Sequence, residues 1–197
     1  MKNKIIKDAL ALTLITLVAG VALGGVYEIT KDPIAKQEAQ AKAEAYEQVF
    51  TDAAAFEEVE MDDTLLQTIR DQLDQEGYKA QSIEEVMRAE DQSGETLGYA
   101  FTVVTSEGYG GDIQFSMGVQ NDGTLNGISI LSIGETAGLG MNADTPAFKD
   151  QFVGKQVEKL QYTKNGATQD DEINAISGAT VTTNAMTNGV NAGLCAF

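Results

Sequence analysis

The sequence predicts an α+β protein: a single N-terminal transmembrane helix followed by an antiparallel-sheet domain with flanking helices. Three observations support this fold class. An uncharged apolar run fills residues 9–26, strand-like segments separated by turn signals fill residues 83–133, with clear apolar/polar alternation at 113–119, and helical patterns occur before and after that region. A period of two is typical of half-buried strands, and a period near 3.6 is typical of amphipathic helices.

The apolar run at 9–26 has the length and composition of a membrane anchor. With Ile5 and Ile6 before it and Tyr27 after it, the run approaches the ~20 residues that cross a ~30 Å hydrocarbon layer. Aromatic residues such as Tyr27 favour the membrane interface. We therefore expect residues 1–27 to be a cytoplasmic N-terminus and a transmembrane helix in the lipid bilayer. A secretory signal peptide is the alternative, because the lysine-rich start and apolar middle fit one as well.

The charge distribution predicts the orientation of this anchor. Lys2, Lys4 and Lys7 precede the apolar run, and the positive-inside rule places such a start in the cytoplasm. The C-terminal domain is then expected on the extracytoplasmic face of the cell membrane. The net charge is −17, with 30 acidic against 13 basic residues, and such a surface repels nucleic acid. No nucleic-acid partner is expected.

The composition also narrows the chemistry that the chain can perform. It has no His and a single Cys, so the commonest general base, the commonest metal ligand and an intramolecular disulfide are all missing. We expect no catalytic residue and no metal site. Cys195 is expected to be a small apolar residue in the last helical turn. Redox chemistry would therefore depend on an organic cofactor or on neighbouring subunits.

Two helices are expected between the anchor and the sheet. Asp32-Pro33 opens a run rich in Ala, Glu, Gln and Lys, and Pro is favoured in a first helical turn. This run, Ile34 to about Phe50, is expected to form the helix of a stalk that covers residues 28–56. Apolar residues at helical spacing predict a second helix over Thr64–Gln75.

The middle of the chain predicts an antiparallel meander. Strands are expected at Ile83–Ala89 and Leu97–Thr105, joined by a turn at 91–94. Further strands follow at 113–119 and 125–133, joined by the hairpin signal Asn-Asp-Gly at 121–123. Thr145 is then expected to cap a short helix that runs to about Phe152, and 160–163 predicts a last short strand.

Residues 174–184, with the sequence NAISGATVTTN, form the most distinctive stretch. They predict a small-residue turn that enters a helix. A helix N-terminus offers unpaired N–H groups and a partial positive charge, which favour a phosphate, and the hydroxyls of Ser177, Thr180, Thr182 and Thr183 would add donors. The alternative is a purely structural role, because Ser, Thr and Asn are also good N-caps.

The S-G-A-T sequence at 177–180 resembles the signature of the flavin-binding subunits of the Rnf and Na-translocating NADH:quinone reductase complexes. The resemblance implies that FMN is attached to Thr180 through a phosphoester bond by a flavin transferase, next to Ser177, Gly178 and Ala179. The family usually has Asp three positions before the Ser, where this chain has Asn174. A second Gly-Ala-Thr, ending at Thr168, lacks the Ser, and we interpret residues 165–168 as a hairpin turn.

Further blocks follow the order and spacing of the same family: GYGG at 108–111, VQNDG at 119–123 and GETAGLG at 134–140, where Ala137 replaces the usual Pro. The resemblance implies an FMN-binding domain over 57–197, with the flavin ring between the glycine loop and the Thr180 helix. The expected ring contacts are Glu135, Thr136, Gly138, Leu139 and Gly140, with Tyr109 flanking. Glycines would let the backbone approach a flat ring. Glu135 would accept a hydrogen bond from a flavin N–H, or else be solvated.

The resemblance implies a membrane-anchored carrier that relays electrons within an Rnf-type, ion-translocating ferredoxin:NAD oxidoreductase. Its partners would be the other membrane and redox subunits of that complex, and the isolated carrier would not turn over. Three alternatives remain: the C subunit of a Na-translocating NADH:quinone reductase, a stand-alone extracytoplasmic flavoprotein reductase, and a non-catalytic adaptor domain. A bound flavin separates the first two from the adaptor.

Overall fold

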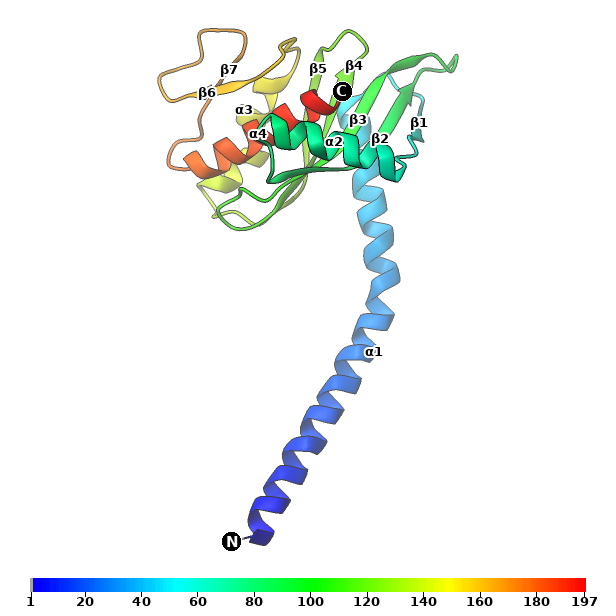
Figure 1. Ribbon diagram of the computed structural model, residues 1–197, viewed down its shortest axis with the longest axis vertical. Coiled ribbons are helices and arrows are strands. Elements are labelled where there is room, and N and C mark those ends of the chain that lie inside the picture. The colour runs from blue at the N-terminus through cyan, green and yellow to red at the C-terminus, as the bar shows by residue number, and fades with distance from the viewer. Residues whose placement is uncertain (1) are drawn as a thin grey trace. The chain divides into compact units, whose positions relative to one another are not determined.

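A single helix, α1 (Lys2–Val49), forms the N-terminal part of the computed structural model, which describes residues 2–197 (Figure 1). The prediction that a separate helix begins at Pro33 is wrong, because Pro33 lies inside α1. Proline removes one helical hydrogen bond, but the Ala-, Glu-, Gln- and Lys-rich residues after it are strong helix formers. The helix ends at Val49, before the expected end of the stalk.

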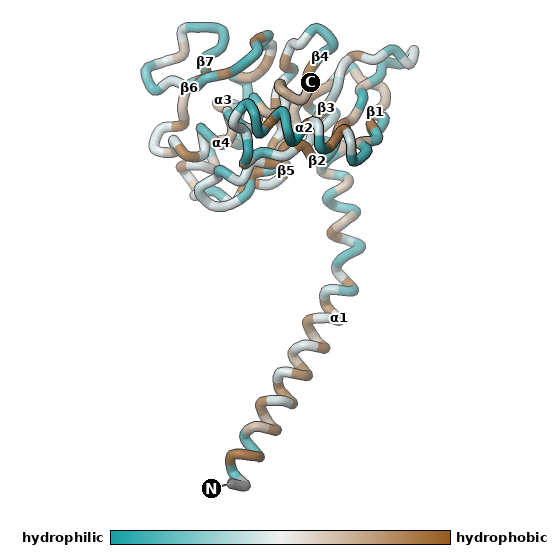
Figure 2. Tube along the Cα trace, viewed as in Figure 1, coloured by the Kyte–Doolittle hydropathy of each residue, from teal (hydrophilic) through white to brown (hydrophobic). Residues whose placement is uncertain are grey.

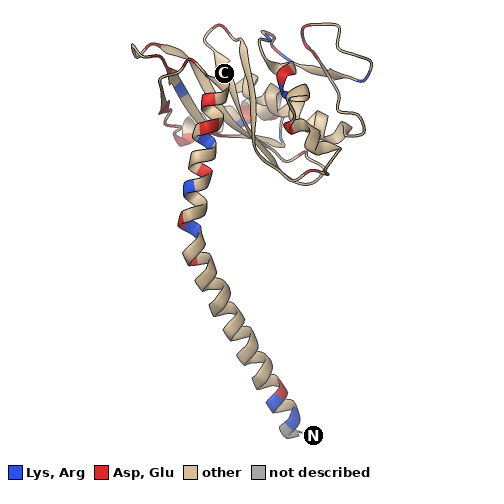
Figure 3. Cartoon of the chain, turned by 180° about the vertical axis from the view of Figure 1, so that it is seen from behind, with Lys and Arg blue, Asp and Glu red and all other residues tan. Residues whose placement is uncertain are grey.

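The first part of α1 presents apolar side chains to its surroundings. The segment Lys4–Val49 contains a stretch with a mean hydropathy of 2.3, long and apolar enough to cross a membrane. Figure 2 shows the apolar residues in the N-terminal part of the helix, and Figure 3 shows that charged residues flank this part on both sides. Large apolar residues from Ile5 to Ile29 are more than half exposed, as expected for a helix that contacts lipid. The chain divides at residues 41 and 42 into two units, and the rest of the fold belongs to the second.

The second unit is built on a five-stranded antiparallel meander, as the sequence predicted. The strands lie in the sheet in chain order: β1 (Ala55–Glu58), β2 (Gln81–Glu90), β3 (Thr96–Thr105), β4 (Ile113–Gln120) and β5 (Leu125–Ile133). The predicted turns join them. The Asp91 carboxylate accepts hydrogen bonds from the N–H groups of Ser93 and Glu95, and Gly123 has the positive φ of +84° that its turn requires. The short edge strand β1 was not predicted.

Two helices cover one face of the sheet and enclose the main core. These are α2 (Asp63–Gln75) and α4 (Thr180–Ala196), and they lie side by side (Figure 1). Helix α4 approaches closely because its residues are small where it meets the sheet. A Cβ on Gly189 would lie 2.8 Å from the Phe115 ring, and one on Gly193 would overlap the Met117 sulfur. These close approaches to β4, with the packing of α4 on β3 and β2, fix the position of the helix on the sheet.

The last turns of α1 pack on the other face of the sheet, where the residues of the strands are small or polar. The Phe50 ring lies over Gly98 and Gly118, where a Cβ would come within 2.9 Å of it. The hydroxyls of Tyr46 and Thr102 share a hydrogen bond of 2.7 Å. Burial of the phenol raises the pKa of Tyr46 above its usual value. This face fixes the helix by close approach and by hydrogen bonds rather than by a large apolar core.

The segment between β5 and α4 is mostly irregular. It contains a 3₁₀ turn at Gly140–Asp144, α3 (Pro146–Lys149), a second 3₁₀ turn at Asp150–Phe152, and the two short strands β6 (Gln161–Thr163) and β7 (Glu172–Asn174). Thr145 precedes α3, but its hydroxyl donates to the Asn142 carbonyl at 2.7 Å, so the predicted side-chain cap is wrong. Strands β6 and β7 are parallel, so residues 165–168 form a connecting loop and the predicted hairpin turn is also wrong.

Candidate functional site

A pocket lies at the start of α4 and joins three segments that are distant in sequence. Its volume is about 480 Å³. The lining residues come from the 108–111 loop, from the 134–140 loop and from the first turn of α4: Tyr109, Glu135, Thr136, Leu139, Gly140, Gly178, Ala179, Thr180, Val181 and Thr182. The structure thus brings the glycine loop and the S-G-A-T turn together, as the sequence led us to expect.

Thr180 is the first residue of α4, and the residue before it leaves the helix start open. The N-cap is Ala179, whose methyl group has no polar atom with which to cap the helix. The N–H groups of a first helical turn have no partner within the helix. The structural-cap interpretation of the motif is therefore wrong for this helix: neither Ser177 nor Thr180 occupies the cap position.

The turn before α4 is held from beneath by Thr183. This residue is completely buried, and its hydroxyl donates to the Ala179 carbonyl at 2.9 Å. The same oxygen accepts a hydrogen bond from the Ile176 N–H at 3.0 Å. Its one donor is therefore used within the turn, and Thr183 supports the site rather than facing a ligand. Gly178 makes the reversal of the chain, with φ at +76°.

The remaining motif residues lie at different depths. Ser177 and Gly178 are exposed on the turn, Thr180 is half-buried, and Thr182 is buried. Ser177 does not line the pocket, whereas Thr180 and Thr182 do. Of these residues, Thr180 is the one that is both partly exposed and part of the pocket lining at the first position of α4.

The glycine loop at 134–140 forms the second wall. The N–H groups of Leu139 and Met141 both donate to the Thr136 carbonyl, and Gly138 completes the turn with φ at +77°. Leu139 then contacts the S-G-A-T turn, because a Cβ on Gly178 would lie 3.1 Å from Cδ2 of Leu139. Leu139 and Val181 leave two exposed aliphatic side chains at the pocket.

Glu135 is buried in this wall, with only 8% of its surface exposed. Its Oε1 accepts hydrogen bonds from the N–H of Tyr109 at 2.7 Å and from the N–H of Gly110 at 3.2 Å. A solvated surface role for Glu135 is therefore wrong. The carboxylate thus contacts the third wall of the pocket, the glycine-rich loop at 108–111. Tyr109 on this loop is 76% exposed.

Two asparagines outside the predicted contacts connect the same loop to α4. The Oε2 atom of Glu107 accepts hydrogen bonds from the side-chain amides of Asn184, at 3.3 Å, and Asn188, at 2.7 Å. Asn184 and Asn188 are four residues apart and so share one face of α4. The i, i+4 pair of amides was visible in the sequence, but its acidic partner lies 77 residues away from Asn184 and could not be identified from spacing.

The geometry of the pocket at the start of α4 fits an FMN group, independently of the sequence motif. The start of a 17-residue helix opens into the pocket, and helix starts favour phosphate. The volume of about 480 Å³ lies within the ~300–1,000 Å³ that is usual for cofactor sites. Aliphatic and aromatic side chains at the pocket suit a flat ring system. Thr180 and the first turn of α4 would hold the phosphate, and Leu139, Val181 and Tyr109 would lie near the ring.

The second Gly-Ala-Thr, at 166–168, has a different environment. Glu172 Oε2 accepts hydrogen bonds from the Thr168 N–H at 2.8 Å, the Thr168 hydroxyl at 3.2 Å and the Gln169 N–H at 3.2 Å. These N–H donors lower the pKa of the Glu172 carboxyl below its usual value. The donors around Thr168 are therefore already engaged by an acidic side chain of the protein.

Asn174, which stands where the family usually has Asp, supports the same loop. Its Oδ1 accepts a hydrogen bond from the Ala167 N–H at 2.7 Å, and its backbone N–H donates to Gln151 Oε1 at 2.6 Å. The side chain is exposed. A carboxylate at this position can accept the same hydrogen bond.

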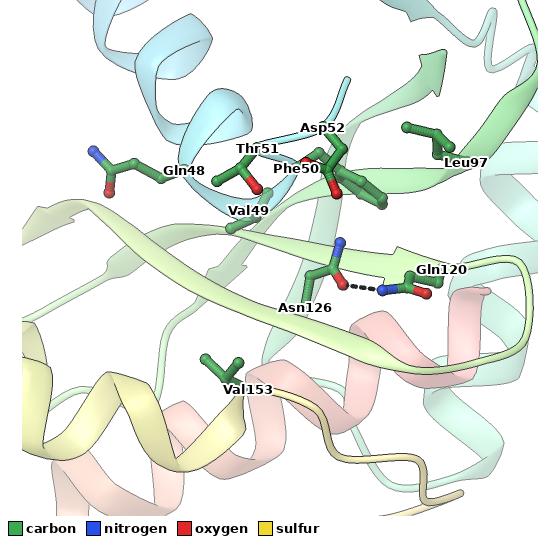
Figure 4. A pocket seen from close by; sticks show the side chains of 9 residues that line it. All are labelled: Gln48, Val49, Phe50, Thr51, Asp52, Leu97, Gln120, Asn126 and Val153. Carbon is green, nitrogen blue, oxygen red and sulfur yellow. Dashed lines mark hydrogen bonds between the residues drawn. The ribbon is translucent and has the colours of Figure 1, made fainter. Parts of the chain in front are cut away.

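A second cavity of about 450 Å³ lies at the other end of β4 and β5 (Figure 4). It is lined by the junction after α1, by the β4–β5 hairpin and by Val153, and Gln120 donates to Asn126 across it at 2.5 Å. None of the residues expected to contact a cofactor lines it. Cys195 is also remote from the pocket: it is partly buried near the C-terminus, and its burial raises the pKa of the thiol.

Comparisons with known proteins identify two families along the chain. The FMN-binding domain family matches residues 108–194, and the RnfG N-terminal region matches residues 1–49. The chain is 33% identical to the G subunit of the Na(+)-translocating ferredoxin:NAD(+) oxidoreductase complex of Acetobacterium woodii, over 95% of this chain and 88% of that protein. It is 29% identical to the G subunit of the proton-translocating complex of Clostridium ljungdahlii, over 96% and 89%.

The similarity to the quinone reductase branch is shorter. The C subunit of the Na(+)-translocating NADH-quinone reductase of Pasteurella multocida is 41% identical over 80 residues, which are 36% of this chain and 31% of that protein. The matches to the two G subunits therefore extend over the N-terminal helix as well as the domain, whereas this match covers about a third of the chain.

Proposed function

The chain belongs to the family of the G subunit of the Rnf-type ion-translocating ferredoxin:NAD oxidoreductases, and we propose that it is the component of such a complex that carries FMN covalently on Thr180. The family makes it a redox component of an oxidoreductase complex, with an FMN-binding domain and other subunits as partners. The quinone reductase alternative is weaker, because its similarity covers only 36% of the chain.

One observation carries the assignment of Thr180: its hydroxyl lies at the open start of α4, in the pocket that three separate segments form. Thr180 Oγ1 would form the ester bond to the FMN phosphate, and the first turn of α4 would hold the phosphate there. The partial positive charge of the helix start would stabilise the phosphate charge. A covalent bond also retains an anionic cofactor on a chain whose net charge is −17.

The bound flavin supplies the redox chemistry, and the chain supplies position and surroundings. The turn at Gly178 sets the direction of the Thr180 side chain. Leu139 and Val181 supply the aliphatic side chains of the pocket, and the exposed Tyr109 lines it as well. With no His in the sequence, the usual group for proton transfer to a substrate is missing. We therefore propose that the protein relays electrons between neighbouring subunits and does not turn over by itself.

The relay is tested with the purified flavin-loaded protein. We expect strong chemical reductants to bleach its absorption, and we expect no turnover with NADH or common quinones. Rapid oxidation of NADH by the isolated protein would instead establish the stand-alone reductase. A colourless protein after purification from the native host would support the adaptor.

We also propose that α1 spans the lipid bilayer with the N-terminus in the cytoplasm and the domain outside. The proposal rests on Lys2, Lys4 and Lys7 ahead of the apolar run, and on the apolar surface of the helix that follows. Protease added to intact protoplasts should cut the domain. Protection in protoplasts, with cutting only in inverted vesicles, would reverse the orientation.

The assignment of Thr180 is tested by two matched substitutions in cells that contain the flavin transferase. Thr180→Ala should abolish the flavin that remains with the protein after precipitation in trichloroacetic acid. Thr168→Ala removes the corresponding hydroxyl of the other Gly-Ala-Thr and should leave the flavin in place. Flavin fluorescence of the Thr180→Ala protein at the wild-type level would refute the assignment.

A further inference from the structure

Glu135 is buried in the pocket wall and bonds to the backbone of the neighbouring loop. Its Oε1 accepts two backbone hydrogen bonds, from Tyr109 and Gly110, and the residue is 8% exposed. Two N–H groups on one carboxylate oxygen form a strong, charge-assisted contact. They come from consecutive residues, so the contact fixes both the position and the direction of the loop that carries Tyr109.

Glycines surround this carboxylate on both loops. A Cβ on Gly108 would lie 3.0 Å from Glu135 Oε1. A Cβ on Gly140 would overlap Glu135 Oε2 and would lie 2.6 Å from the Thr182 hydroxyl. The space beside Gly140 is therefore filled by the protein itself. The expectation that this glycine makes room for a flat ring does not describe the structure: Gly140 makes room for Glu135.

A second carboxylate fixes the same loop from the other side. Glu107 Oε2 accepts hydrogen bonds from the amides of Asn184 and Asn188 on α4. The loop from 107 to 110 is thus connected to α4 through Glu107 and to the 134–140 loop through Glu135. Both contacts join residues of this chain to one another.

From these contacts we propose that Glu135 is a positioning residue, which fixes the Tyr109 loop so that the wall of the pocket is formed before the flavin is attached. Glu135 acts through the backbone of Tyr109 and Gly110 and not by direct hydrogen bonding of its Oε1 to the ring. That this wall borders a flavin rests on the proposed function. That the wall is fixed by Glu135 rests only on the contacts of the chain.

The first arm of the test measures hydrogen exchange of the backbone amides in the full-length chain, in micelles, with Thr180→Ala present so that no flavin is attached. Three variants are compared. Glu135→Ala removes both acceptors, Glu135→Gln keeps an amide oxygen that can accept from both N–H groups, and Glu60→Ala removes an exposed carboxylate elsewhere as a matched control.

We expect Glu135→Ala to speed exchange of the Tyr109 and Gly110 amides by about tenfold or more, because a hydrogen bond to a charged group is among the strong ones. Glu135→Gln should restore most of the protection, and Glu60→Ala should change nothing at these amides. Unchanged exchange in Glu135→Ala, or no rescue by Gln, would overturn the proposal. A general loss of stability would speed exchange throughout the sheet, so amides of β4 serve as the internal reference.

If Glu135→Ala does not fold, Glu135→Asp replaces it. Aspartate keeps the charge, but its side chain is one methylene shorter, so the carboxylate lies farther from the loop. The amides of Tyr109 and Gly110 should therefore exchange faster in Glu135→Asp than in Glu135→Gln. Protection in Asp equal to or greater than in Gln would show that charge alone is sufficient and would overturn the positioning role.

The second arm uses the flavin-loaded chain with Thr180 intact and measures the anisotropy of flavin fluorescence. We expect lower anisotropy in Glu135→Ala than in wild type, with recovery in Glu135→Gln, because a loosened wall leaves the ring more mobile. Unchanged anisotropy beside fast amide exchange would overturn the assignment of this loop to the flavin pocket. Absence of flavin from the wild-type chain would refute the proposed function, while the first arm would still decide the role of Glu135.

Discussion

The chain contains Gly-Ala-Thr twice, at 166–168 and at 178–180, and the two copies lie in different surroundings. Both glycines have a positive φ, +93° at Gly166 and +76° at Gly178. Thr168 lies in the loop between β6 and β7, where Glu172 accepts from its N–H and its hydroxyl. Thr180 begins α4 and lines a pocket.

The difference shows what the motif contributes. A tripeptide with a left-handed glycine makes a turn that exposes N–H donors in either place. At Thr168 those donors already hold a carboxylate, whereas at Thr180 the helix start supplies several N–H groups and an aligned dipole to an incoming anion. Support beneath the turn also differs: Thr183 fixes the copy at 178–180 from the core, while Asn174 fixes the copy at 166–168 from the surface.

The largest effect is expected from valine at the two glycines. Gly178→Val forces a β-branched residue to φ near +76° and presses it against Leu139, so we expect loss of flavin attachment. Gly166→Val meets the same backbone strain in open space. Each should cost about 1–3 kcal/mol in the free energy of unfolding. Denaturation curves and flavin fluorescence check both, and equal flavin loss in the two variants would contradict the difference between the copies.

Thr183→Val should weaken the support of the copy at 178–180. The valine keeps the shape but leaves the buried Ile176 N–H without its acceptor, which costs about 1–3 kcal/mol. Thr187→Val is the control in the same helix. Its hydroxyl only adds a bond to the Thr183 carbonyl, so its loss should cost under about 1 kcal/mol. Flavin occupancy should fall in Thr183→Val and persist in Thr187→Val. Stability equal in the two variants would show that the Ile176 contact contributes little.

The two copies should also respond differently to acid. The pKa of Glu172 is depressed in the folded chain, so its contribution is present above the usual Glu pKa and is lost as pH falls through the depressed value. The amide resonances of Thr168 and Gln169 should therefore titrate with a midpoint below the usual Glu value. The amide of Ile176 has a hydroxyl partner and should not titrate in that range. A common midpoint at both turns would indicate general acid unfolding instead.

The smallest effect is expected from Asn174→Asp. The Asn174 oxygen accepts from the Ala167 N–H, and a carboxylate can accept the same bond. We expect flavin occupancy at or above the wild-type level when both versions are produced with the same transferase, since Asp is usual in the family. A clear loss in the Asp version would mean that the amide group makes a contact specific to this chain.

The regular parts of the fold could be predicted because their signals are local. Alternation predicted β4, Asn-Asp-Gly predicted the turn at 121–123, and the apolar residues after that turn predicted β5. The apolar run at 9–26 predicted the first part of α1. Pro33 was misleading, since a local breaker signal was outweighed by strong helix formers around it. Strand β7 has three residues and pairs in parallel with β6, which no local pattern can specify.

The pocket was only partly predictable. Motif order placed Glu135 and Thr180 in one site, but their partners depend on long-range contacts. Glu135 bonds to Tyr109 across 26 residues, and Thr183 faces the core rather than a ligand. The sequence indicated a polar residue at each position, but the partners of Glu135 on the 108–111 loop and those of Thr183 in the turn before α4 are seen only in the fold.

The central claim, that FMN is bound to Thr180, is tested most directly by mass spectrometry of the chain from its native host. The intact mass should exceed the sequence mass of 21.0 kDa by one FMN less water. Trypsin cannot separate the two copies, because Lys164 is the last basic residue. Cleavage after Glu172 does separate them, and the hydroxyl residues of the resulting C-terminal peptide are Ser177, Thr180, Thr182, Thr183 and Thr187. We predict the added mass on the 173–197 peptide, at Thr180 on fragmentation. An unmodified chain, or the mass on any other residue, would contradict the claim.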